Sequence, residues 1–271
     1  MRGGSQSALV DTDQGFYVVK WRENPQHRRI LINEVVCAEL LKRLGVASPG
    51  WAYVHADRDF IERNPEIRIQ HQHRSTAIEP GWHFGSRFPV DPDHESVYDF
   101  LPSNLIDKVA NRWDFLKVFV FDVWVDNHDS RQAIFFRAPK RGFQVEMIDH
   151  GHALGFDGVD WRFNSSSVRR RYPGASGIYA SAQSAQHYSR AIAAIQELTR
   201  DDLTQLLELL PPEWIGDDKG LLSRQFDRLI DRARRLIELV ADTHALGHVP
   251  CRLPVSRVMV APAPANDVET Q

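Results

Sequence analysis

One stretch near the middle of the chain limits most strongly what the molecule can fold into. Residues 115–125 are apolar on nearly every side of a helical wheel. That pattern is typical of a helix buried at the centre of a folded unit. The stretch ends abruptly at Asp126-Asn-His-Asp129, four polar residues in a row. With 271 residues, of which 42% are hydrophobic, the chain can build a core around this helix as one large domain or two smaller lobes.

Composition narrows the class of protein further. No run of about 18 apolar residues occurs, which excludes a membrane span. The first residues contain no apolar segment of the secretory kind, and two distant cysteines, Cys37 and Cys251, make no disulfide framework. With a net charge of −3, the chain does not have the overall positive charge that most nucleic-acid binders carry. We therefore expect a cytoplasmic enzyme or binding protein that uses neither a membrane nor nucleic acid, and we leave its oligomeric state open.

The first 80 residues predict a β-rich unit with one helix. β-branched and aromatic residues mark the strands, and a 3.6-residue apolar period marks the helix, which Gly45 ends. Irregular sequence after Pro80 marks the expected boundary of this unit. The expected elements are strands at 7–10, 16–21 and 51–55, a helix at 29–44, a loop or insertion with one strand at 56–75, and irregular structure from 80 to 92.

The remainder predicts a mostly helical unit at residues 81–248, followed by a disordered tail at 249–271. Apolar positions keep helical spacing from Leu105 to Val125, and two strands follow at 132–137 and 143–148. Residues 160–186 carry little periodicity. Closer to the end, Thr199-Arg-Asp-Asp202 resembles a helix capping box. A long amphipathic stripe follows, formed by Leu222, Phe226, Leu229, Ala233, Leu236 and Val240.

Lys20 and Glu34 are the first candidates for chemistry. Lys20 ends an apolar strand, where it is either solvated at an edge or a buried cation with a function. Glu34 shares a helix face with Ile30, Cys37 and Leu41. A carboxylate on a core-facing stripe is costly unless it is paired, and Lys20 is the nearby cation. A strand lysine paired with a helix glutamate is how kinases orient lysine on ATP phosphates. A slightly rotated helix would instead leave Glu34 solvated.

The N-terminal residues Gly3, Gly4, Ser5 and Gln6 precede this strand pair. Adjacent glycines allow the backbone to approach phosphate oxygens closely. The signal is weak by itself, because many N-termini contain Gly and Ser. It gains meaning from the strands that lead to Lys20.

Two acidic turns flank the second strand pair. Asp129 follows the buried helix, where a carboxylate can orient a substrate hydroxyl and accept its proton. Asp149 follows the second strand, and a carboxylate there suits magnesium. Each could equally be an ordinary turn aspartate. The order of helix, turn, hairpin and turn brings Asp129 and Asp149 to the same end of the hairpin, which suggests one carboxylate for the nucleophile and one for the metal.

Assembled in order, these residues make the chain resemble the HipA-like kinase family and, more distantly, the phosphoinositide kinases. The resemblance spans about residues 3–245. It rests on a glycine-containing loop (Gly4-Ser-Gln6), an ATP lysine strand (Tyr17-Val-Val-Lys20), an Asn-Glu helix (Asn33-Glu34, with Leu40 and Leu44-Gly45), the approach to the catalytic aspartate (Val125 to Asp129) and a metal motif (Ile148-Asp-His-Gly-His152).

The resemblance implies an α+β protein-kinase-like fold with a β-rich N-terminal lobe and a mostly helical C-terminal lobe. It also implies ATP and magnesium binding and transfer of phosphate to a hydroxyl, with a Ser or Thr of a protein as the expected acceptor. Lys20 would hold ATP phosphates, Glu34 would fix Lys20, and Asp129 would orient the acceptor. Asp149 would bind magnesium.

The catalytic turn departs from the family pattern. Family members often have Asp-Arg-His-x-x-Asn, whereas this chain has Asp129-Ser-Arg-Gln-Ala-Ile134. Without a gap Ile134 takes the place of the metal-side Asn. With a loop two residues shorter, Gln132 takes it and offers a carbonyl to magnesium on a longer arm. This departure motivates an alternative, a pseudokinase that binds nucleotide or a partner without catalysis. The chain also begins almost at the glycine loop and lacks the additional N-terminal subdomain of HipA toxins, which weakens any inference of toxin function.

Histidines near both aspartates allow a further alternative. Together with Asp129 and Asp149, the side chains of His128, His150 and His152 could bind zinc or manganese and activate water, as in a metallohydrolase. That alternative leaves Lys20 and Glu34 unexplained. A Ser- and Arg-rich stretch at residues 165–171 could receive an acidic group or could simply be solvated.

Overall fold

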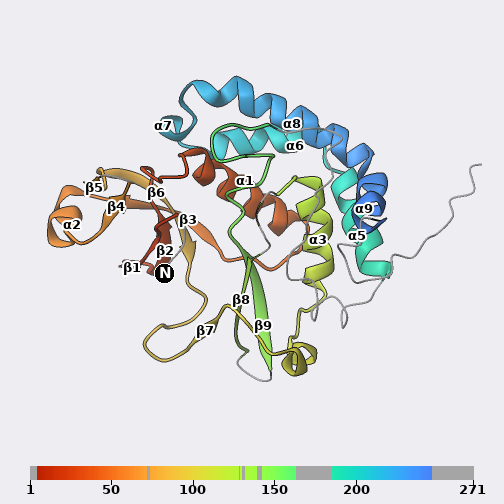
Figure 1. Cartoon of the computed structure of the whole chain (residues 1–271), viewed down its shortest axis with the longest axis horizontal. Coiled ribbons are helices and arrows are strands. Elements are labelled where there is room, and N and C mark those ends of the chain that lie inside the picture. Colours follow the sequence, from red (N-terminus) through yellow and green to blue (C-terminus); the bar gives the residue numbers. More distant parts are fainter. Residues whose placement is uncertain are drawn as a thin grey trace, which may run out of the picture.

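The computed structural model describes residues 5–71, 74–127, 129, 132–138, 142–162 and 185–245. A β-sheet stands at one end of the molecule, most of the helices stand at the other, and α1 lies between them (Figure 1). The main hydrophobic core runs through both parts, from α1 to the C-terminal helices. The two ends are therefore packed on one another through α1.

A four-stranded antiparallel sheet forms the N-terminal end, with strand order β1-β2-β6-β3. Gly15 starts the second strand at a φ of +104°, in the left-handed region that glycine adopts without strain. The strands are β1 (Ala8–Thr12), β2 (Gly15–Lys20), β3 (Trp51–Ala56) and β6 (Gly81–Arg87). The three strands predicted before residue 56 are confirmed. The prediction of irregular structure after Pro80 is wrong, because β6 is the strand between β2 and β3.

Helix α1 (Arg29–Arg43) follows β2. Ten of its fifteen residues are buried, including the polar Asn33 and Glu34. It contacts β6 on one side and the C-terminal elements α7 (Pro212–Ile215) and η2 (Leu206–Leu209) on the other. Because α1 touches both ends of the molecule, its position sets how they meet.

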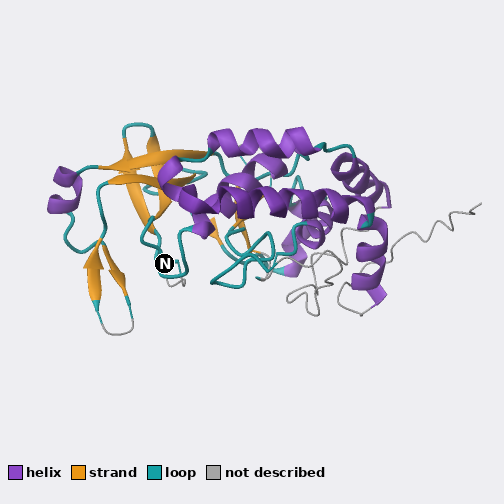
Figure 2. Ribbon diagram, turned by 90° about the horizontal axis from the view of Figure 1, so that it is seen from above, coloured by secondary structure: helices purple, strands orange, loops and turns teal. Residues whose placement is uncertain are grey.

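The segment between β3 and β6 holds more regular structure than predicted. Asp57 caps a short helix, α2 (Arg58–Arg63), by accepting a hydrogen bond from the Phe60 N–H at 2.7 Å. Two short strands, β4 (Arg68–Gln70) and β5 (Ser75–Ala77), pair in a separate ribbon. This ribbon projects away from the four-stranded sheet (Figure 2). The polar sequence concealed both the helix and the second strand.

The apolar stretch forms α3 (Asp114–Trp124), which begins later than predicted. Before it, residues Ser103–Lys108 form a 3₁₀ helix, η1. Val109 then bridges Phe143, and the Ala110 N–H donates to the Phe143 carbonyl at 2.9 Å, so this part of the chain pairs with a strand instead of coiling. Strands β8 (Gln132–Arg137) and β9 (Phe143–Ile148) form the predicted hairpin, and β7 (Val97–Tyr98) pairs with β8.

The C-terminal helices pack around α3, as the contacts of α5, α8 and α9 with it show (Figure 1). The predicted capping box is present, with the Thr199 N–H donating to Asp202 Oδ2 at 2.9 Å and the Asp202 N–H donating to Thr199 Oγ1 at 3.2 Å. The predicted apolar stripe is buried but divides between two helices at Arg235. The elements are α5 (Ala185–Gln196), α6 (Arg200–Gln205), η3 (Gly216–Asp218), α8 (Lys219–Arg234) and α9 (Leu236–Ala245).

Among the described helices, none is both long and apolar enough to cross a membrane. The predicted tail at 249–271 and the Ser- and Arg-rich stretch at 165–171 lie outside the described residues.

Candidate active site

Lys20 is the centre of a buried ion-pair network. It ends β2, and its Nζ donates hydrogen bonds to Glu34 Oε1 on α1 and to Asp149 Oδ1 at 2.7 Å. The side chains of Lys20 and Glu34 are 9% and 7% exposed, whereas that of Asp149 is 27% exposed. The predicted pairing of Lys20 with Glu34 is thus present, and Asp149 is the more accessible of the two carboxylates.

The charges in this network support one another. Burial by itself disfavours a cation, but the nearby charges of Glu34 and Asp149 outweigh it and raise the pKa of Lys20. Burial also acts on Asp149 in the direction of a higher pKa, but the charge of Lys20 prevails and lowers the pKa of this carboxyl. At neutral pH Lys20 is therefore a cation and Asp149 an anion.

The turn that carries Asp149 has little spare room. Asp149 has a φ of +61°, and two residues later a Cβ on Gly151 would lie 2.6 Å from Ile30 Cγ2 and 3.3 Å from Glu34 Oε1. The other oxygen of Glu34, Oε2, accepts a hydrogen bond from the His150 N–H at 3.3 Å. Glycine is needed at position 151 because the turn lies directly against α1.

Asn33, the residue before Glu34 on α1, also holds the turn that follows Asp149. Its Nδ2 donates to the carbonyls of Gly151 at 2.7 Å and Ala153 at 3.0 Å. Its Oδ1 accepts from Trp161 Nε1 at 3.0 Å. The sequence pattern pointed to Asn33 only as part of a motif and assigned it no contact. The available signal was an amide next to Glu34 within an otherwise apolar part of the helix.

The end of α3 leads to Asp129 through a second polar network. The Asp129 N–H donates to Asn127 Oδ1 at 3.1 Å, and Asn127 Nδ2 donates to Asp122 Oδ1, also at 3.1 Å. Asp122 Oδ1 is 3.7 Å from His150 Nε2, next to Asp149. Gln132 at the start of β8 pairs with Ile148 at the end of β9. Asp129, just before β8, and Asp149, just after β9, therefore lie at the same end of the hairpin, as predicted. Asp122, buried within α3, was missed by the sequence reasoning.

Arg232 of α8 closes the other side of this helix end. Its Nε donates to the Trp124 carbonyl at 2.8 Å, and its Nη2 donates to the Val123 carbonyl. Burial lowers the pKa of Arg232, while the charge of Asp126 acts in the opposite direction. A cation at a helix C-terminus satisfies both the free carbonyls and the negative end of the dipole. The sequence contained no signal for this contact, because Arg232 lies 108 residues from Trp124.

The remaining predicted site residues belong to the glycine-containing loop and to the histidine group. Gln6 is anchored to the backbone of Gln70, donating to its carbonyl and accepting from its N–H, both at 2.7 Å. The Ser5 carbonyl accepts from Asn24 Nδ2 at 3.4 Å. His152 packs against the Phe156 ring, with centroids 5.9 Å apart. Gly3, Gly4 and His128 lie outside the described residues.

The Asp149 carboxylate is a ligand of the chemical type that magnesium prefers. Within the described ranges, no group of three or more His, Cys, Asp or Glu side chains is placed to hold a metal ion. Magnesium needs only one or two protein carboxylates when substrate phosphates and water complete its octahedral shell. Asp149 fits that requirement. Gln132, the predicted second ligand, begins β8 opposite Ile148, the residue before Asp149.

Comparison with known proteins identifies the family of the chain. A family model described as HipA-like kinase matches residues 8–244. The chain belongs to the HipA-like kinase family. The matched range contains the whole Lys20–Glu34–Asp149 network, and it reaches into the last described helix of this HipA-like kinase.

Solved structures show the same fold at low sequence identity. A chain of the Shewanella oneidensis MR-1 toxin–antitoxin complex of HipA, HipB and operator DNA is 15% identical, with a TM-score of 0.54 over 90% of this chain and 67% of that one. A Golgi casein kinase with Mn/ADP bound is 14% identical, with a TM-score of 0.50 over 91% of this chain and 71% of that one. No curated protein matches the sequence. The HipA-like chain therefore has an α+β protein-kinase-like fold.

Proposed function

We propose that this HipA-like protein is an ATP- and magnesium-dependent phosphotransferase that moves the γ-phosphate of ATP to a hydroxyl, with a Ser or Thr of a protein as acceptor. The observation that carries the proposal is the contact of Lys20 with both Glu34 and Asp149. A lysine held by a helix carboxylate beside a metal-binding aspartate is the arrangement that positions ATP in kinases. The Golgi casein kinase of the same fold has Mn/ADP bound, which supports nucleotide binding as the function of this fold.

Each residue has a defined role in the proposed reaction. Lys20 binds the phosphates of ATP, and Glu34 fixes the direction of its side chain. Asp149 holds magnesium, which neutralises charge on the phosphates when it is bound. Asp129 orients the acceptor hydroxyl and takes its proton. Gln132 is proposed as a second metal ligand. The glycine-containing loop is proposed to cover the phosphates with the backbone N–H groups of Gly3, Gly4, Ser5 and Gln6. The Gln6 side chain is not assigned this role, because it already bonds to the Gln70 backbone.

The proposed division into two lobes follows from the same arrangement. We place the N-terminal lobe at the start of the chain and the helical lobe after it, with the active site between them. The boundary first expected at residue 80 moves to the end of β6 at Arg87, because β6 pairs with both β2 and β3. The nucleotide would then lie between the sheet that carries Lys20 and the hairpin that precedes Asp149.

A pseudokinase is the second candidate, and the catalytic turn is the observation that favours it. Ile134 lies within β8 and pairs with Glu146 of β9. The aliphatic side chain of Ile134 offers no oxygen to a metal. Ile134 therefore cannot replace the metal-binding Asn that the family often has at this position. Gln132 is the remaining ligand of suitable chemistry.

Label transfer from γ-³²P-ATP separates these functions. Purified protein is incubated with labelled ATP and magnesium beside the Asp129→Ala and Asp149→Ala variants, with a mixture of candidate acceptor proteins. Transfer that both variants lose supports the kinase. ATP-dependent thermal stabilisation without transfer supports the pseudokinase. Stoichiometric zinc in the purified protein, with no effect of ATP, contradicts both and supports a metallohydrolase.

A further inference from the structure

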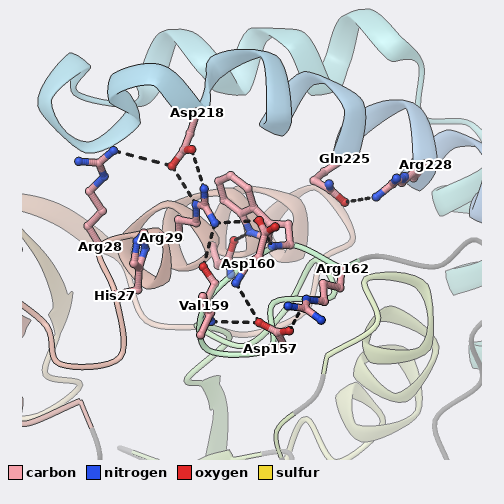
Figure 3. A network of polar contacts seen from close by, with 12 residues as sticks. His27, Arg28, Arg29, Asp157, Val159, Asp160, Arg162, Asp218, Gln225 and Arg228 are labelled. Atoms are coloured by element: carbon pink, nitrogen blue, oxygen red, sulfur yellow. Dashed lines mark hydrogen bonds and ion pairs between the residues drawn. The ribbon is translucent and has the colours of Figure 1, made fainter.

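The N-terminal end of α1 is tied to two other segments by a single side chain, Arg29. Its Nε donates to Asp218 Oδ2 at 2.8 Å, and its Nη2 donates to Asp218 Oδ1 at 2.6 Å. Its Nη1 donates to Asp160 Oδ1 and to the Val159 carbonyl, each at 2.9 Å (Figure 3). One guanidinium therefore joins α1, the loop after the Asp149 turn and the residue before α8.

This contact differs from an ordinary surface ion pair. The side chains of Arg29 and Asp218 are only 12% and 9% exposed, and the Arg29 guanidinium lies over the Trp161 ring at 4.7 Å. Exposed ion pairs contribute little, but a two-pronged Arg–carboxylate contact shielded from water is directional and strong. Hydrogen bonding from Arg29 lowers the pKa of Asp218, which keeps this carboxyl ionised. Arg28 adds a second cation 3.8 Å from Asp218 Oδ2.

Helix α1 has no negative charge of its own in its first turn, although His27 Nδ1 accepts a hydrogen bond from the Arg29 N–H at 3.2 Å. Arg28 occupies the N-cap position without a side-chain cap, and no acidic residue lies in the first turn. Arg28 and Arg29 instead place positive charge at the positive end of the helix dipole. Asp218 and Asp160 supply, from other parts of the chain, the negative charge that α1 itself lacks there.

The loop that Arg29 grips is itself ordered by local contacts. Asp157 Oδ1 accepts hydrogen bonds from the N–H groups of Val159 at 3.0 Å and Asp160 at 2.8 Å, which makes a tight turn (Figure 3). Arg162 Nε adds an ion pair to Asp157 Oδ2 at 2.9 Å. The turn directs the Val159 carbonyl and the Asp160 carboxylate at the same guanidinium.

A continuous set of contacts leads from this guanidinium to the candidate active site. Arg29 holds residues 159–160, and Trp161 next to them donates to Asn33, one helical turn along α1 from Arg29. Asn33 in turn holds the Gly151 carbonyl, and Glu34 beside it binds Lys20. A shift of the first turn of α1 would therefore move Glu34 relative to Lys20.

We propose that Arg29 and Asp218 form a clamp that positions α1 and keeps Glu34 against Lys20. Arg29 is a positioning residue in this proposal, because it touches neither the phosphates nor the acceptor. The consequence for catalysis rests on the proposed phosphotransfer, whereas the effect of the clamp on α1 does not.

Hydrogen exchange of the nucleotide-free protein tests the clamp without any need for activity. The variants are Arg29→Lys and Asp218→Asn, with Arg43→Lys as the matched control. Arg43 also joins α1 to a C-terminal helix, but through one contact of 3.0 Å to Asp202 between side chains that are 31% and 36% exposed. We expect exchange of residues 29–36 and 149–162 to rise about tenfold in the two clamp variants and to stay unchanged in the control. Unchanged exchange in these segments, or an equal rise throughout the molecule, overturns the clamp.

Steady-state kinetics test the positioning role. We expect Arg29→Lys to lower kcat about tenfold with KM for ATP altered less than about twofold, since small displacements of positioned groups cost rate more than binding. The double variant should be no slower than the slower single variant, because both substitutions break one contact. A rise in KM without a loss of kcat, or multiplicative effects in the double variant, contradicts the proposal. If the wild type itself transfers no phosphate, the proposed function fails and the exchange measurement alone judges the clamp.

Discussion

Lys20 and Asp149 are 129 residues apart in the sequence, yet Lys20 Nζ lies 2.7 Å from Asp149 Oδ1. This contact joins the end of β2 to the turn after β9, and Glu34 on α1 completes it. In the proposed reaction Lys20 would bind the ATP phosphates and Asp149 would hold magnesium. The free protein therefore holds the two groups that are proposed to bind nucleotide and metal against one another.

Removal of the Lys20 charge should destabilise the fold as well as abolish the proposed binding of ATP. The variant Lys20→Met leaves the carboxylates of Glu34 and Asp149 close together and without their shared cation. Loss of one partner of a buried ion pair costs about 3–5 kcal/mol. We expect a loss near the lower end of that range in the free energy of unfolding, measured by urea denaturation, because Asp149 is 27% exposed.

Lys42→Met is the matched control for this substitution, since the Lys42 side chain is 77% exposed and pairs with Glu39 only at 4.0 Å. Its stability should stay within about 0.5 kcal/mol of the wild type. The further change Glu34→Gln should restore part of the stability of Lys20→Met by removing one of the two neighbouring negative charges. Equal stability of Lys20→Met and Lys42→Met would contradict the buried network.

Gly151→Ala should weaken the contact between the Asp149 turn and α1. The added Cβ would meet Ile30 Cγ2 at 2.6 Å. Overpacking of this kind costs about 1–3 kcal/mol. Thermal unfolding should show the loss, and the loss should shrink in an Ile30→Ala background, where the clashing methyl is absent. Gly50→Ala is the control, because no atom lies within 4 Å of its added Cβ. The same loss in both backgrounds would count against this contact.

Glu146 should make stability depend on pH. Burial raises its pKa from 4.5 to about 7, and its Oε2 is buried without a hydrogen-bond partner among the described residues. The folded protein then binds a proton more tightly than the unfolded chain, so this group costs stability as the pH rises from about 4.5 to about 7.

The variant Glu146→Gln removes that cost. We expect it to match the wild type near pH 4.5 and to exceed it by about 1–3 kcal/mol at pH 8, measured by urea denaturation at a series of pH values. Glu66→Gln, at an exposed position, serves as the control. A difference between Glu146→Gln and the wild type that is the same at every pH would refute the raised pKa.

Arg232→Met should lower the stability of the fold at the C-terminal end of α3. The substitution leaves the carbonyls of Val123 and Trp124 without the donors that satisfy them at the end of α3. Unpaired buried polar groups cost about 1–3 kcal/mol each. Thermal denaturation should therefore show a clear loss for Arg232→Met and almost none for Arg234→Met, whose side chain is 73% exposed. If the two variants unfold alike, Arg232 has no such role.

The parts of the site that the sequence predicted came from signals that were ambiguous one by one. Lys20 was a cation on an apolar strand, Glu34 an acid on a core-facing helix stripe, and Asp149 an acid at a strand end; their order along the chain is what singled them out. The strand hairpin was clearer, because turn residues at 138–142 separate two β-rich runs.

The missed parts depend on contacts between distant segments or on an atypical composition. Strand β6 begins with Gly81 and contains Gly85, where an added Cβ would lie 2.5 Å from Val54 Cγ2. Glycine there serves close packing of β3 on β6, although it reads as a loop signal in the sequence. The clamp joins Arg29 to Asp218 across 189 positions, and no local pattern connects them.

The magnesium dependence of ATP binding tests the central claim most directly. Calorimetric titration would measure the Kd for ATP at several magnesium concentrations in the wild type and in Asp149→Asn. We predict that magnesium tightens binding to the wild type about tenfold or more and has little effect on the variant, because Asp149 is the proposed ligand. If magnesium tightens binding equally in both proteins, or if the wild type binds no ATP, the Lys20–Asp149 contact is not a nucleotide–metal site.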